Sequence, residues 1–192
     1  MTDMLPLFLN LSGRIVVLVG GGPVAAAKLR QLRAANATVR VVSPEVVDDI
    51  ARASGERVSV VRRPFDPADL DDAWLVVAAA TSEVNRAVAE AAAARRLFVN
   101  AVDDPANATA FLSGVVRRSG VTLAISTAGD APALTALLRE AIDAVLPDDL
   151  ERWLQSARDA RALWRRDGVE MSARKPQLLR ALNELYVEAP WQ

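Results

Sequence analysis

Three small residues, Gly20, Gly22 and Ala25, follow an apolar run with the spacing G-x-G-x-x-A. This spacing is typical of dinucleotide-binding turns. The first glycine permits a tight turn, the second lets the backbone approach a pyrophosphate, and the third small residue allows close packing of helix on strand. A helix beginning near Pro23 would direct its free N–H groups at the phosphates. A glycine-rich turn can also simply connect a strand to a helix, so the surrounding residues must show whether this one binds a dinucleotide.

A second apolar run ends at Pro44-Glu45, twenty-five positions after Gly20. An acidic residue at about this place binds the adenosine ribose hydroxyls, and its charge favours NAD over NADP. An alternative is that Ser43 caps the next helix and Pro44 opens it, and both readings can hold together. The predicted cofactor-binding residues are Gly20, Gly21, Gly22, Pro23, Val24, Pro44, Glu45 and Thr81.

Asp103 follows a further apolar run and is the candidate general base. The chain contains no histidine and no cysteine, so proton transfer falls to carboxylates, hydroxyls or the substrate itself. Disulfides, thiolate catalysis and a cysteine metal site are excluded, and no cluster of residues has metal-ligand spacing. Asp103-Asp104-Pro105 is also ordinary turn chemistry after a strand, so a plain turn remains the alternative.

Apolar runs and helix-like stretches alternate through the first part of the chain, which predicts parallel βαβ units and an α/β, Rossmann-type parallel sheet. Ligands of such sheets gather at the carboxyl ends of the strands, where the glycine turn, Glu45, Thr81 and Asp103 all fall. The predicted strands are 14–19, 38–43, 58–62, 74–80 and 97–102, and the predicted helices are 24–35, 45–54 and 83–96.

The pattern changes after Pro105. Two strand-like runs, 110–118 and 121–126, are joined at Ser119-Gly120, which predicts a hairpin rather than a crossover. Three helical stretches follow, at 132–146, 149–167 and 176–187. We therefore predict three parts: a nucleotide-binding domain at 1–109, a hairpin-and-helix segment at 110–146 and a small helical domain at 147–192.

Composition narrows the range of functions. A net charge of −1 over 192 residues argues against nucleic-acid binding, which calls for a concentrated basic surface. No apolar run approaches the roughly 20 residues of a membrane span, and Met1-Thr2-Asp3 begins without a basic region. We expect a cytoplasmic protein with neither a nucleic acid nor a membrane as partner.

Six motifs, in this order along nearly the whole chain, resemble the precorrin-2 dehydrogenase and sirohydrochlorin ferrochelatase family, of the sirohaem synthase N-terminal type. The motifs are Leu5–Leu9, Val19–Ala25 with Lys28, Val41–Glu45, Ala78–Thr81 with Val84-Asn85, Phe98–Asp103, and Ser126–Pro132 leading into Leu137–Arg139.

The resemblance implies a homodimer in which the NAD-binding domain, a dimerisation segment and the small helical domain enclose a tetrapyrrole. It implies NAD-dependent dehydrogenation of precorrin-2 to sirohydrochlorin, with Asp103 as the catalytic residue and Thr127 as a hydroxyl near the tetrapyrrole. Arginine suits the carboxylates of such a substrate. The predicted substrate-binding residues are Asn100, Arg117, Thr127 and Gly129.

Three functions remain open from the sequence. The first is a bifunctional enzyme that also inserts Fe²⁺, as a second substrate, into sirohydrochlorin. The second is a dehydrogenase alone. The third is a catalytically silent NAD-sensing module, which would explain Gly20–Gly22 and Glu45 but gives no role to Asp103 or to the loop 126–132.

Overall fold

The structure, a computed structural model, describes residues 4–112 and 114–187. The chain divides into two compact units. The first runs through residue 112 and includes 128–130, and the second holds 113–127 and the residues from 131 onward. The three-part division at residues 109 and 146 stays a prediction.

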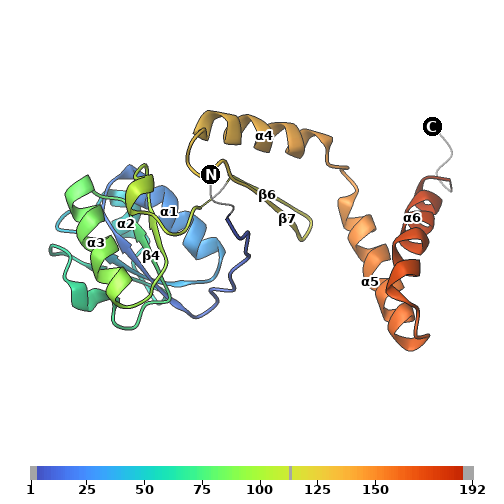
Figure 1. Ribbon diagram of the computed structural model, residues 1–192, viewed down its shortest axis with the longest axis horizontal. Coiled ribbons are helices and arrows are strands. Elements are labelled where there is room, and N and C mark those ends of the chain that lie inside the picture. Colours follow the sequence, from blue (N-terminus) through green and yellow to red (C-terminus); the bar gives the residue numbers. More distant parts are fainter. Residues whose placement is uncertain (1–3, 113, 188–192) are drawn as a thin grey trace. The chain divides into compact units, whose positions relative to one another are not determined.

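The first unit is built on five parallel strands in the order β3-β2-β1-β4-β5 (Figure 1). Chain order and spatial order differ because β4 pairs with β1 on the side opposite β2, which is the arrangement of a doubly wound sheet. The α/β, Rossmann-type prediction is confirmed. The strands are β1 (Ile15–Val19), β2 (Thr38–Val42), β3 (Val58–Val61), β4 (Leu75–Ala78) and β5 (Val99–Ala101).

Helices cover both faces of this sheet, with α1 and α3 on opposite sides of the strands in Figure 1. Helices α1 (Pro23–Ala34) and α2 (Asp48–Arg52) pack on one face, against side chains such as Val16 and Val77. Helix α3 (Ser82–Ala94) packs on the other face, against side chains such as Val17 and Val99. Because β1 and β4 are apolar on both faces, they form the buried centre of the unit.

Two short 3₁₀ helices, η1 (Pro67–Leu70) and η2 (Pro105–Asn107), complete the first unit. Asp69 in η1 is 6% exposed, and the Arg63 guanidinium donates to both of its carboxylate oxygens, at 2.5 and 2.8 Å. This guanidinium holds the pKa of the Asp69 carboxyl below its usual range. The pair fastens η1 to the chain leaving β3.

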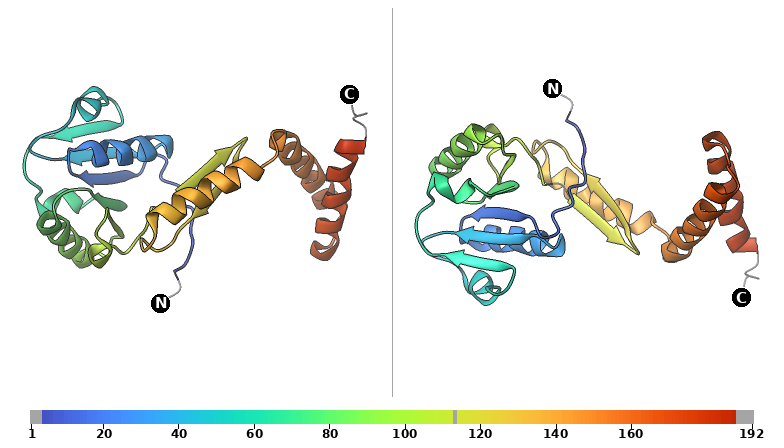
Figure 2. Two further views of the ribbon diagram at one scale, coloured as in Figure 1. Left: turned by 90° about the horizontal axis from the view of Figure 1, so that it is seen from above. Right: turned by 90° about the horizontal axis from the view of Figure 1, so that it is seen from below.

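The second unit begins with an antiparallel hairpin, as predicted, and α4 lies along this hairpin in both views of Figure 2. The Arg118 guanidinium donates to the Leu146 carbonyl and to Asp143 at 2.9 and 3.0 Å, which joins the hairpin to α4 and its C-terminal end. The elements are β6 (Gly114–Arg118), β7 (Val121–Ile125), α4 (Pro132–Val145), α5 (Leu150–Arg166) and α6 (Met171–Val187).

Helix α6 begins at Met171, so the prediction of a start at residue 176 is wrong. Pro176 lies inside the helix, where it cannot donate a backbone hydrogen bond, and α6 packs against α5. The Trp164 indole N–H, for example, donates to the Gln177 side chain at 2.6 Å. Within residues 4–112 and 114–187, no helix is long and apolar enough to cross a membrane.

Candidate functional site

The turn after β1 begins with two glycines, Gly20 and Gly21, that no other residue could replace without movement of the backbone. Gly20 has a φ of +127°, a conformation that side chains disfavour, and its N–H donates to the Val42 carbonyl at 3.0 Å. A Cβ on Gly20 would overlap the Ala79 carbonyl of the strand end next to it. This first glycine therefore permits both the turn and the close approach of two strand ends.

Gly21 fixes the loop that carries the acidic residue. A Cβ at this position would overlap the Glu45 carbonyl, and the Gly21 carbonyl accepts the Val47 N–H at 2.8 Å. Helix α2 begins only at Asp48, so the alternative in which Ser43 caps a helix is wrong. Residues 43–47 instead fold against the glycine turn and leave Pro44 and the Glu45 side chain exposed.

Gly22 differs from its neighbours because a Cβ there would meet no atom within 4 Å. It is the N-cap of α1, and Pro23 occupies the first turn. The first N–H groups of a helix have no partner within it, and the helix dipole adds positive potential. Open space beside unpaired donors fits a pyrophosphate, so this end of α1 suits a dinucleotide.

A pocket of about 270 Å³ lies at the carboxyl ends of β4 and β5, beside the first turn of α1. The side-chain oxygen Oδ1 of Asn85 accepts the Ala80 N–H at 3.2 Å and so holds the loop after β4 in place. Thr81, the N-cap of α3, lies in the chain between Ala80 and Ser82, which both line the pocket. The pocket is lined by Val24, Ala79, Ala80, Ser82, Asn85, Val102, Asp103 and Asp104.

Asp103 lies in this pocket with a φ of +56°, in the left-handed region that residues other than glycine rarely adopt. The preceding residue, Val102, is fixed by its N–H, which donates to the Ala78 carbonyl at 2.8 Å. The Asp104 carboxylate accepts the side-chain N–H of Asn107 at 2.9 Å. Strained backbone is commoner at functional sites than elsewhere, and here it places an exposed carboxylate at a strand end.

Lys28, one turn after Val24 on α1, is half-buried. Burial lowers the pKa of the Lys28 ammonium group because it penalises the charged form, and the charge of Asp103 opposes this effect. Sequence reasoning gave Lys28 and Asn85 no role of their own. Each is a polar residue about one turn inside a helix that follows a parallel strand, and this position was the sequence signal that could have identified both residues.

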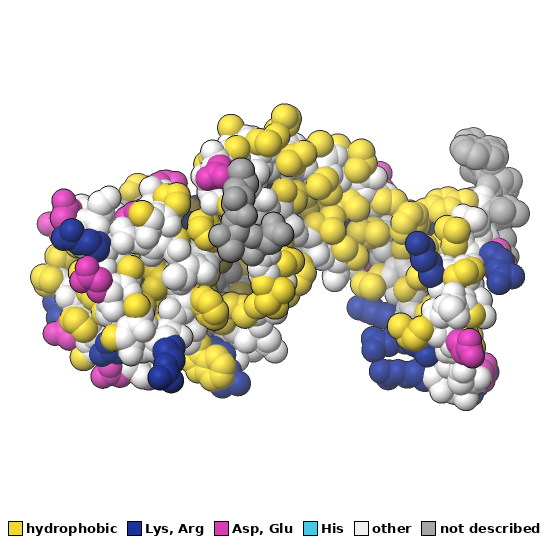
Figure 3. Space-filling model, viewed as in Figure 1, with side chains coloured by type: hydrophobic (Ala, Val, Ile, Leu, Met, Phe, Trp, Pro, Cys, Tyr) yellow, Lys and Arg dark blue, Asp and Glu magenta, His cyan; other side chains and the backbone are white. Residues whose placement is uncertain are grey.

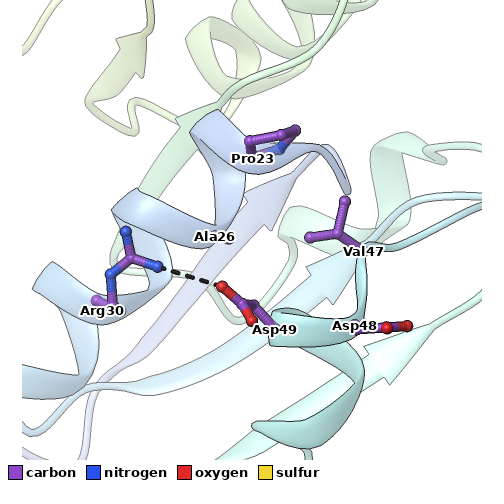
Figure 4. A pocket seen from close by; sticks show the side chains of 6 residues that line it. All are labelled: Pro23, Ala26, Arg30, Val47, Asp48 and Asp49. Atoms are coloured by element: carbon purple, nitrogen blue, oxygen red, sulfur yellow. Dashed lines mark ion pairs between the residues drawn. The ribbon is translucent and has the colours of Figure 1, made fainter.

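A second pocket, of about 500 Å³, lies between α1 and α2 (Figure 4). Pro23 and Ala26 line it from α1, and Val47 and Asp48 line it from the start of α2. In Figure 4 the Arg30 side chain reaches across from α1 to Asp49, with 3.7 Å between the charged atoms. This pocket and the one at Asp103 border opposite flanks of α1.

Asn100, a predicted substrate contact, is buried in the middle of β5. Its neighbours Val99 and Ala101 pack on the α3 side, so Asn100 lies on the opposite face. The side-chain N–H donates to the Ala110 carbonyl at 3.0 Å, and the side-chain oxygen has no hydrogen-bond partner among the described residues. An unpaired buried oxygen marks a place where a donor is missing.

The other predicted substrate residues are divided between the two units. Gly129 belongs to the first unit and has a φ of +87°; a Cβ there would lie 3.5 Å from Phe111 and Pro105. Thr127 belongs to the second unit, and its hydroxyl accepts the Ala131 N–H at 3.2 Å before α4. Arg117 is exposed on β6 of the second unit. Substrate binding by these residues stays a prediction.

Comparisons with known proteins agree with this geometry. Residues 7–114 match the family model described as "Putative NAD(P)-binding". The chain is 40% identical over 179 residues to siroheme synthase 2 of Aeromonas salmonicida (strain A449), covering 85% of this chain and 37% of that protein. It is 37% identical over 175 residues to the siroheme synthase of Salmonella arizonae, covering 90% of this chain and 38% of that protein. The chain thus spans little more than a third of these relatives.

A solved structure named "SirC, precorrin-2 dehydrogenase" superposes with a TM-score of 0.70 at 26% sequence identity. The match covers 92% of this chain and 88% of that one. Prediction of a nicotinamide dinucleotide cofactor is confirmed, because the matched family model spans the glycine turn, Glu45 and the Asp103 pocket. The chain belongs to the precorrin-2 dehydrogenase and siroheme synthase family, and residues 7–114 are its NAD(P)-binding domain.

Proposed function

We propose that this protein catalyses the NAD-dependent dehydrogenation of precorrin-2 to sirohydrochlorin, a step of sirohaem biosynthesis. The observation that carries the proposal is the place of Asp103, which lines a pocket at the ends of β4 and β5 beside the first turn of α1. The names of the relatives support it, since one is a precorrin-2 dehydrogenase and others are siroheme synthases.

The cofactor is held by the glycine turn and the start of α1, where backbone N–H groups meet the pyrophosphate. Glu45 binds the adenosine ribose hydroxyls and disfavours a 2′-phosphate. When bound, NAD supplies the hydride acceptor. The proposed cofactor-binding residues are Gly20, Gly21, Gly22, Pro23, Val24, Pro44, Glu45 and Thr81.

Dehydrogenation removes a hydride and a proton from the substrate, so the site needs a base as well. Asp103 accepts the proton: it is an exposed carboxylate, and the chain has no histidine to take this role. The Arg117 guanidinium binds a tetrapyrrole carboxylate, and Asn100, Thr127 and Gly129 complete the substrate contacts.

A homodimer is part of the proposal. Helix α4 has no buried side chain, and Leu137 on it is 62% exposed. Figure 3 shows hydrophobic side chains gathered over α4 and the hairpin. Monomeric proteins rarely leave a large contiguous apolar patch in water. A second copy of the chain covers this surface, with α4 at the centre of the interface.

Two further functions are distinguished by experiment. A silent NAD-sensing module would bind NAD without turnover, but it gives no role to the Asp103 carboxylate in the pocket. Iron insertion would use Fe²⁺ as a substrate; within residues 4–112 and 114–187, no three acidic side chains come together as a metal site. A cytoplasmic location stays a prediction.

One anaerobic experiment tests the three functions together. The purified protein receives precorrin-2 and NAD, and absorbance follows the formation of sirohydrochlorin and NADH. Fe²⁺ is then added, and the sirohaem spectrum is recorded against a protein-free control that contains the same amount of sirohydrochlorin. NADH formation in step with sirohydrochlorin is the expected result. NAD binding without turnover would contradict the proposal and favour the sensing module, and faster sirohaem formation than in the control would add iron insertion.

A further inference from the structure

The chain segment that carries Asp103 leaves β5 and returns to the same strand. Residues 101–108 form this loop, which begins at the end of β5 and ends where Thr109 comes back beside Val99. In the described part of the chain β5 is the last strand of its sheet, so the returning segment lies along its outer edge. Compact loops with neighbouring ends often carry functional residues. The contacts that close the loop therefore bear on the position of Asp103.

Thr109 closes this loop with hydrogen bonds to Val99. The Thr109 hydroxyl accepts the Val99 N–H at 2.9 Å, and the Val99 carbonyl accepts the backbone N–H groups of Thr109 and Ala110 at 2.8 and 2.9 Å. The Asn100 side chain adds a further bond, which it donates to the Ala110 carbonyl at 3.0 Å. Both backbone polar groups of Val99 are thus bonded to the returning chain.

The Thr109 hydroxyl is the part of this closure that a substitution at residue 109 can remove. The backbone groups of Thr109 and Ala110 would be present in almost any residue, because only proline lacks the N–H. Without the hydroxyl, the Val99 N–H would lose its partner in a partly buried place, which is unfavourable. The end of the loop would then be held less firmly.

Asp103 needs such support because its backbone conformation is unfavourable by itself. Its φ of +56° lies in the left-handed region, and a residue other than glycine stays there when the surrounding structure fixes it. Before Asp103, the Val102 N–H donates to the Ala78 carbonyl at 2.8 Å. After Asp103, the closure at Thr109 fixes the chain where it returns to β5. Asp103 lies between these two fixed points.

We propose that Thr109 is a positioning residue for Asp103: its hydroxyl closes the loop 101–108 and so keeps the Asp103 carboxylate where it receives the substrate proton. The inference rests on the proposed role of Asp103 as the base. A base acts only when its oxygen lies within hydrogen-bond reach of the proton that it takes, so a small displacement of Asp103 slows the reaction. Thr109 acts through the loop and not on the reacting atoms.

Hydrogen exchange followed by NMR tests the closure without any activity. Thr109→Val replaces the hydroxyl by a methyl group, whereas Thr109→Ser keeps the hydroxyl. In Thr109→Val the backbone N–H groups of Val99 and Val102 are expected to exchange about tenfold faster or more, because the loop opens more often. Thr109→Ser is expected to match the unaltered protein, and the N–H of Val17 in the buried strand β1 is the internal reference. Equal exchange in Thr109→Val and the unaltered protein overturns the inference.

Kinetics test the consequence for catalysis. Thr109→Val is expected to lower kcat about tenfold or more with little change in the Kd of NAD, and Thr109→Ser to keep most of the rate. Thr38→Val is the matched control, because it makes the same change in β2, which is not next to β5 in the sheet. In an Asp103→Asn background, Thr109→Val is expected to have no further effect on kcat. An equally large loss in that background would overturn the inference.

Further outcomes separate this inference from the proposed function. A lower rate that Thr109→Val and Thr109→Ser share would overturn the inference, since the hydroxyl would not be responsible. Full activity of Asp103→Asn would contradict the base assignment, while hydrogen exchange would still decide whether Thr109 closes the loop. Circular dichroism shows whether each variant is folded. If Thr109→Val does not fold, Thr109→Ala, which also lacks the hydroxyl, carries the same expectations.

Discussion

Gly21 and Glu45 are in such close contact that a Cβ on Gly21 would overlap the Glu45 backbone carbonyl. The Gly21 carbonyl also accepts the Val47 N–H, so two segments distant in the chain are tied at one point. Gly22, the next residue, has open space where its Cβ would be. The two adjacent glycines therefore have different roles: Gly21 is needed for folding, and Gly22 leaves room for the cofactor.

Substitutions at these two positions should separate folding from binding. Gly21→Ala is expected to lower the free energy of unfolding by about 1–3 kcal/mol, because the atom that it meets is backbone and cannot turn away. Gly22→Val is expected to fold but to bind NAD about tenfold or more weakly, because its side chain enters pyrophosphate space. Denaturant unfolding and calorimetric titration with NAD measure both. Normal NAD affinity in Gly22→Val would remove the turn from the cofactor site.

Cofactor choice should depend on Glu45, which is exposed in the loop held by Gly21. The protein is expected to bind NAD more tightly than NADP because the carboxylate repels a 2′-phosphate. Glu45→Gln is expected to narrow the difference between the two Kd values, with Glu83→Gln on α3 as the control. Tighter binding of NADP by the unaltered protein would show this account of specificity to be wrong.

Lowering the pH should reduce the free energy of unfolding, in part because Asp69 becomes protonated. Its folded pKa is held below the usual value by Arg63, so its contribution is present at neutral pH and is lost as the pH falls through that lowered pKa. Asp69→Asn is expected to cost about 1–3 kcal/mol at pH 7 and progressively less as the pH falls below the ordinary aspartate value of 3.8 and through the lowered pKa of Asp69. Urea unfolding at several pH values tests this. Asp49→Asn, whose side chain is 58% exposed, is the control, and an equal loss in both variants would refute the prediction.

Association should depend on α4. Leu137→Asp is expected to give a monomer at micromolar concentration, because a charge would replace an apolar side chain at the centre of the proposed interface. Phe98→Asp, on an exposed aromatic residue of the first unit, is the control and is expected to leave the dimer intact. Sedimentation velocity distinguishes the species. A monomeric unaltered protein would contradict the proposed dimer.

Much of the fold follows from local patterns in the sequence. The apolar run that ends at Gly20 identified β1 and α1, because a buried parallel strand and a tight turn each need particular residue types. The start of α6 could not be found in this way. Pro176 lies inside α6, which begins at Met171, and a proline within a helix is not a signal from which its start can be placed.

The site residues could be predicted from the sequence where the carboxyl ends of the strands could be predicted. Parallel topology places Glu45, Thr81 and Asp103 at one edge of the sheet, and the sequence shows this order. Whether a side chain there is buried depends on its face, and Asn100 lies between two apolar neighbours in a strand covered on both sides. The opposing effects of burial and of the Asp103 charge on the pKa of Lys28 involve separate elements, and no local pattern encodes them.

The central claim is that Asp103 is the base of an NAD-dependent dehydrogenase, and one comparison tests it most directly. Initial rates of sirohydrochlorin formation from precorrin-2 and saturating NAD are measured for the unaltered protein, Asp103→Asn and Asp104→Asn. Asp103→Asn is expected to lose about 100-fold or more in rate at unchanged NAD affinity, because asparagine cannot accept the proton. Asp104→Asn, whose native carboxylate is bonded to Asn107, is expected to stay close to the normal rate. A near-normal rate in Asp103→Asn, or a larger loss in Asp104→Asn, would contradict the account.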